Sequence, residues 1–76
     1  MMEAVTKKQF LEIANELAQQ QNEYFEGFII DECNIFANGV IQFGAKGLDT
    51  AKKIVLADEI RNKIEPILKA KYIVVG

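Results

Sequence analysis

Residues 25–46 constrain the fold of this chain more than any other stretch, because two runs rich in Ile, Phe and Val flank the dipeptide Asn38-Gly39. Both central residues of a type I′ turn need a positive φ, which Asn and Gly adopt readily. The pattern therefore predicts an antiparallel β-hairpin. A two-residue turn would also fix its register, with Phe36 opposite Ile41.

Side chains alternate along a strand, so this register would sort the hairpin residues onto two faces. The more aromatic face is expected to meet the core, and it carries Phe28, Ile30, Phe36, Ile41, Phe43 and Ala45. The opposite face is expected to stay uncovered, although it is too apolar for a surface that meets only water. We therefore predict a protein interface on that face, formed by Ile29, Cys33, Ile35, Val40 and Gln42.

A first helix is expected before the hairpin, over residues 7–22. Thr6 and Gln9 have the spacing of a capping box, in which each side chain bonds the other residue's backbone amide. Val5 is placed to pack against Phe10 across the start of this helix. Apolar residues then recur at helical spacing, which predicts one buried stripe.

A second helix is expected after the hairpin, with Asp49 or Thr50 as its N-cap. Pro66 lacks an amide donor and disfavours helical geometry in the residue before it. We expect the helix either to stop near Ile64 or to kink at the proline. Residues 71–75 then predict a third strand.

These elements predict a single α+β domain over residues 1–76, in the order α-β-β-α-β. The second helix is long enough to return the chain parallel to the second strand through a right-handed crossover. Placing the third strand beside the first gives a three-stranded sheet of order 2-1-3. The expected architecture is a two-layer sandwich with an N-terminal hairpin and both helices on one face.

Charge is distributed unevenly along the chain, although the net charge is only −2. Residues 9–45 contain no Lys or Arg. This asymmetry predicts an acidic docking surface on the first helix and the segment that follows it. Alternatively, it serves only to attract the two halves of the fold to each other. The residues expected in the acidic surface are Glu12, Glu16, Glu23 and Glu26.

The chain lacks most side chains on which catalysis relies. It contains no His, no Ser and no Trp, and its one Cys is Cys33. Without His or Ser, neither a Ser-His-Asp triad nor a Cys-His pair can form within one subunit. The acidic pairs at 31–32 and 58–59 diverge, and the usual soft-metal ligands are missing. We therefore predict a non-enzymatic protein without metal or cofactor.

Cys33 is expected to act as a small buried apolar residue instead of a reactive thiol. Its neighbours Asp31 and Glu32 carry negative charge, which should raise the pKa of the thiol. Asp31 should also pair with Lys46 across the hairpin, and an exposed pair of this kind contributes roughly 0.2–1 kcal/mol.

The stretch Gly44-Ala45-Lys46-Gly47 precedes the second helix and matches a GxxG pattern. Together with the α-β-β-α-β order, it resembles the type II KH fold. That resemblance implies nucleic-acid binding through this turn and Lys46, Lys52 and Lys53. In this chain GxxG would join a strand to a helix, whereas in KH domains it joins two helices. The pI near 5.0 also argues against nucleic acid as the main partner.

Nothing in the sequence predicts a membrane segment, because no apolar run approaches the roughly 20 residues that span a bilayer. Residues 1–10 lack the pattern of a secretory signal. We expect a cytoplasmic protein, as a single Cys also suggests.

The function expected from the sequence is a small protein-interaction module. It would be a homodimer, or an inhibitor or adaptor that binds a partner protein through the uncovered sheet face or the acidic surface. Short chains of this kind include phage- or plasmid-borne inhibitors of host enzymes. This is an analogy with a class of proteins and not a match to a family.

Overall fold

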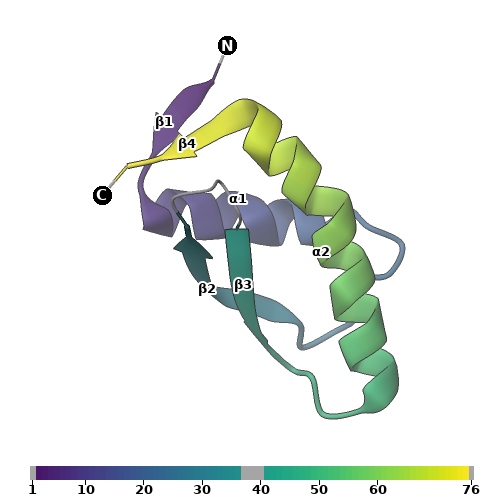
Figure 1. Cartoon of the computed structure of the whole chain (residues 1–76). Helices are drawn as coiled ribbons and strands as arrows, with labels where there is room; N and C mark the ends of the chain where they lie inside the picture. Colours follow the sequence, from purple (N-terminus) through teal and green to yellow (C-terminus); the bar gives the residue numbers. More distant parts are fainter. Residues whose placement is uncertain (1, 37–40, 76) are drawn as a thin grey trace.

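The computed structural model describes residues 2–36 and 41–75 (Figure 1). It confirms a small α+β fold, which begins with a strand that the sequence analysis missed. The elements are β1 (Glu3–Val5), α1 (Lys7–Gln19), β2 (Ile29–Ile35), β3 (Ile41–Lys46), α2 (Ala51–Lys71) and β4 (Tyr72–Val74).

The strands form two separate two-stranded sheets, so the predicted three-stranded sheet of order 2-1-3 is wrong. β1 and β4 pair in parallel and lie side by side at one end of the molecule (Figure 1). β2 and β3 form the antiparallel hairpin. β4 therefore pairs with β1, a strand too short to stand out in the sequence, and not with β2.

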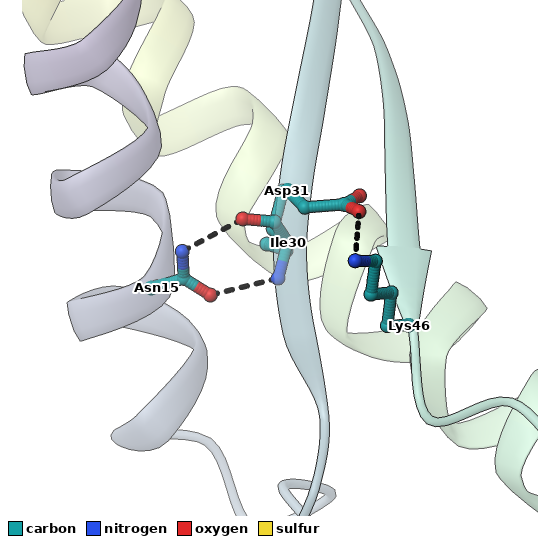
Figure 2. Close-up of polar contacts among 4 residues, drawn as sticks. All are labelled: Asn15, Ile30, Asp31 and Lys46. Atoms are coloured by element: carbon teal, nitrogen blue, oxygen red, sulfur yellow. Dashed lines mark hydrogen bonds and ion pairs between the residues drawn. The ribbon is translucent and has the colours of Figure 1, made fainter.

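The edge of β2 that β4 was expected to join is occupied by a side chain of α1. Asn15 accepts a hydrogen bond from the amide of Ile30 at 2.8 Å and donates one to the carbonyl of Ile30 at 2.9 Å (Figure 2). These are the groups that a neighbouring strand would bond. Asn15 thus closes this edge near the start of β2.

The capping box that was predicted for α1 is confirmed. The Gln9 amide donates to Thr6 Oγ1 at 3.2 Å, and the Thr6 amide donates to Gln9 Oε1 at 2.9 Å. Val5 and Phe10 are both buried on either side of this cap. The helix ends at Gln19, three residues before the predicted end at 22.

Helix α2 begins after Thr50, whose Oγ1 accepts a hydrogen bond from the Lys53 amide at 3.2 Å. The helix runs through Pro66 to Lys71, so the alternative in which it stops near Ile64 is wrong. Pro66 is exposed. A proline in a helix leaves the carbonyl four residues earlier without its hydrogen bond, and here that is the carbonyl of Asn62. Asn62 is exposed as well, so water can bond this carbonyl.

The predicted hairpin register is wrong, by one residue from Glu32 to Ile35 and by two at the start of β2. Ile41 pairs with Ile35, where Phe36 was expected, and Cys33 pairs with Phe43. The predicted turn at Asn38-Gly39 lies outside the described residues. A one-residue shift moves side chains to the other face, because the strand period is two.

A β-bulge then keeps the start of β2 in the core. The register shifts between Ile30 and Glu32, so Ile30 pairs with Ala45, where Glu32 was expected. The extra residue lets Ile30 and Cys33 point to the same side although they are three apart. Both are buried, at 3% exposure each.

The core lies between the hairpin, α1 and α2. Its most enclosed large side chains come from both helices, and they are Phe10, Ile60, Ile64 and Leu68. Phe10 also stacks against Phe43 with ring centroids 6.2 Å apart. The helix-facing side of the hairpin completes the core with Phe28, Ile30, Cys33 and Ile41.

Candidate functional site

The predicted interface residues do not share one face of the hairpin. Ile29 and Gln42 are exposed on the face of the hairpin that points away from the helices, which we call the open face. Cys33 is buried on the opposite, helix-facing side. Ile35 lies on the side of its partner Ile41, at the end of the sheet. Val40 lies outside the described residues. The open face instead carries mainly polar residues, among them Glu32, Asn34 and Gln42, all exposed. The shifted register is the physical reason.

The acidic residues are only partly available for docking. Glu12 and Glu16 are exposed one turn apart on α1, and Glu26 is exposed before β2. Glu23 is bonded to α2 through Lys63, with Nζ 2.6 Å from Oε2. That hydrogen bond is the main reason that the pKa of Glu23 lies below its usual value. Glu23 therefore ties the α1–β2 loop to α2.

Two of the three lysines of the nucleic-acid alternative are paired with carboxylates. Lys46 Nζ lies 3.7 Å from Asp31 Oδ2, which confirms the predicted ion pair (Figure 2). Lys53 Nζ lies 2.9 Å from Asp49 Oδ1, and this contact lowers the pKa of Asp49. Lys52 is exposed. These pairs offset the positive charge that phosphate binding would need.

The GxxG stretch has a packing role where β3 ends. Gly44 belongs to β3, and Gly47 follows the strand with φ of +89°. A Cβ on Gly47 would lie only 2.5 Å from the carbonyl oxygen of Gly27. Glycine is therefore required where the two ends of the hairpin meet, which accounts for it without a phosphate.

Cys33 has the properties of a structural residue. Burial raises the pKa of its thiol; the charge of Lys7 lowers that pKa by less, and Glu32 adds a smaller rise. The thiolate is the reactive form, so this environment suppresses its chemistry.

A metal-binding cluster is not found in the part of the chain that the structure describes. No group of three or more His, Cys, Asp or Glu side chains there could hold a metal ion. Within the same residues, no helix is long and apolar enough to cross a membrane.

Two adjoining hollows lie between the far end of the hairpin and β4, and we call them together the β4 groove. They measure about 340 and 440 Å³ and share Ile35 and Val74. The residues that line them come from the start of α1, the hairpin, the end of α2 and β4. It consists of Lys7, Phe10, Asn34, Ile35, Phe36, Ile41, Lys69, Tyr72, Ile73 and Val74.

Large apolar side chains are exposed on both walls of the β4 groove. On the hairpin side, Ile35 is 41% and Phe36 50% exposed. On the opposite side, Ile73 is 50% exposed. Contiguous exposure of this kind is typical of an interaction surface.

The charged residues that line the β4 groove are both positive. Lys7 comes from the start of α1 and Lys69 from the last turn of α2. No Asp or Glu lines either hollow. The charged lining of the β4 groove thus differs in sign from Glu12 and Glu16, the exposed acids of α1.

A smaller cavity of about 200 Å³ lies between the hairpin and the first half of α2. Its apolar wall includes Phe28, Phe43 and Ile54, and its rim carries Asp58 and Arg61, which are bonded to each other at 2.7 Å. The β4 groove differs from this cavity in that no Asp or Glu lines it.

Most residues of the β4 groove were not predicted from the sequence. Of its lining residues, only Ile35 was predicted to belong to an interface. Residues 71–75 were expected to form an edge strand that pairs with the first hairpin strand, whereas the structure pairs them with β1. Comparisons with protein families, with curated proteins and with solved structures find no match to this chain.

Proposed function

We propose that this protein is a protein-interaction module and that the β4 groove is its binding surface. One observation carries the proposal: Ile35, Phe36 and Ile73 expose large apolar side chains along the β4 groove, which the buried Phe10 also lines. Covering these side chains removes apolar surface from water, which is the main favourable term in most protein association.

The absence of a suitable catalytic set in the sequence supports a binding role. The chain has no His or Ser, and its one thiol is buried. The proposal keeps the expected class of function and moves the interface from the open face of the hairpin to its end.

The test uses a matched pair of substitutions on β2. Ile35→Glu places a charge in the β4 groove, whereas Ile29→Glu places one on the open face of the same strand. The two side chains have similar exposure, at 41% and 54%. Circular dichroism and thermal unfolding of both variants would establish that each is folded.

Two measurements then follow on wild type and both variants. A displayed random-peptide library is selected against each protein, and sedimentation velocity is recorded over a concentration series. We expect peptide enrichment or self-association in wild type and Ile29→Glu, and neither in Ile35→Glu. A monomeric wild type that enriches no peptide, or binding that Ile35→Glu leaves unchanged, would overturn the proposal.

A further inference from the structure

We propose that the β4 groove takes an extended segment of a partner protein that is acidic as well as apolar, laid along the free edge of β4. This inference builds on the proposed function and adds the conformation and the charge of the bound segment.

The lining of the groove indicates that it follows the edge of a strand. Tyr72, Ile73 and Val74 are consecutive in β4, and all three line it. Successive side chains of a strand point to opposite faces, so three in a row can border one groove only along the strand's edge.

The other edge of β4 is already occupied. It pairs in parallel with β1, and beyond β4 the Val75 amide donates to the Val5 carbonyl at 2.7 Å. An extended segment can therefore add only on the groove side, over about 10 Å for three residues. On the outer edge of β2, Asn15 already bonds the amide and the carbonyl of Ile30.

The floor of the groove specifies apolar side chains in the bound segment. Phe10 and Ile41 line it and are almost fully buried, at 1% and 6% exposure. Alternate side chains of an added strand would point onto this floor. Polar side chains there would lose water without gaining a partner.

The lysines beside the groove favour negative charge in the bound segment. Lys69 Nζ lies 3.4 Å from Glu65 on the same helix, and no ion pair joins Lys7 to another described residue. Glu3 lies opposite Tyr72 in the β1–β4 register but does not line the groove. Complementary charge steers association and rejects wrong partners.

The test compares three synthetic peptides in which Val alternates with Asp, with Ser or with Lys. Binding to wild type is measured by NMR titration, which also identifies the residues that respond. We expect the Asp peptide to bind about fivefold to tenfold more tightly than the Ser peptide, the Lys peptide to bind most weakly, and shifts to concentrate at β4 and Ile35.

Two controls separate the charge from the backbone. In the double variant Lys7→Glu and Lys69→Glu, the Lys peptide should bind most tightly. An Asp peptide with N-methyl groups at alternate residues on its strand-pairing edge should lose binding, because it can no longer donate to β4.

The outcomes distinguish this inference from the proposed function. Equal affinity for the Asp and Ser peptides would overturn the charge preference while leaving the groove as a binding surface. Self-association that depends on Ile35, without peptide binding, would show that a second copy is the occupant and would overturn the inference alone. No binding of any peptide and no self-association would overturn both.

Discussion

Asn15 bonds both backbone polar groups of Ile30, with Oδ1 2.8 Å from the amide nitrogen and Nδ2 2.9 Å from the carbonyl oxygen (Figure 2). Nδ2 also lies 3.0 Å from the Leu11 carbonyl oxygen, which fixes the orientation of the side-chain amide. One side chain of α1 thus takes the place of a neighbouring strand on the edge of β2. This pair both docks the helix and ends the sheet.

Asn15→Ala should lower the free energy of unfolding by about 1–3 kcal/mol, because it leaves the amide and carbonyl of Ile30 without partners in a partly buried site. Asn15→Asp should cost at least as much at neutral pH, since a carboxylate accepts from the amide but cannot donate to either carbonyl. Urea unfolding measures both. Asn62→Ala, on the exposed side of α2, is the control and should change little. Equal losses at both positions would contradict the role of Asn15.

Gly47→Ala should destabilise the protein more than Gly27→Ala. Both glycines have a positive φ, of +89° and +92°, so either substitution strains the backbone by about 1–2 kcal/mol. Only at Gly47 would the new Cβ also meet backbone, 2.5 Å from the Gly27 carbonyl oxygen, while nothing lies within 4 Å of a Cβ at Gly27. Thermal unfolding of the pair isolates the close approach, and equal shifts would show that it does not matter.

The Cys33 thiol should react with iodoacetamide only as fast as the protein opens, because it is buried and its pKa is raised. A raised pKa means that the unfolded chain ionises first. The protonated thiol therefore stabilises the folded state. This stabilisation is complete below about pH 8.5 and is lost as the pH rises through the thiol pKa of the folded protein. The difference in free energy of unfolding between wild type and Cys33→Val should fall over that range. A difference that is constant with pH, or fast alkylation of the folded protein, would contradict this.

Lys63→Gln should lower the melting temperature near pH 7 but have less effect in acid. The hydrogen bond from Lys63 lowers the pKa of Glu23, so the stability from this pair is present above about pH 4.3. It is lost as the pH falls through the lower pKa of the folded state. Melting temperatures of wild type and variant from pH 7 downward should converge. Lys52→Gln, a change at an exposed lysine of the same helix, should show no such trend.

Several local elements could be predicted because their causes lie within a few residues. The Thr6–Gln9 cap depends on neighbours in the chain, and so does the Thr50 cap of α2. The hairpin was expected from strand-forming residues on either side of a turn, and the Asp31–Lys46 pair follows from bringing those strands together.

The groove and the strand order depend on contacts between distant residues. Asn15 is one polar residue beside an apolar stripe, and nothing in its neighbourhood indicates that it will meet Ile30. The bulge at 30–32 is equally hidden, yet with the shifted register it brings Cys33 and Ile35 to the helix side. β1 has only three residues, and it forms a strand because β4 returns beside it.

The sequence by itself determined the helices, the hairpin and the absence of His and Ser, because local hydrogen bonding and composition are properties of the chain. Tertiary structure decided which strands pair, which hairpin side chains face the core, and that Ile35 meets β4 across a groove. These depend on backbone groups that can be satisfied in more than one way, and packing of α1 on β2 selects among them.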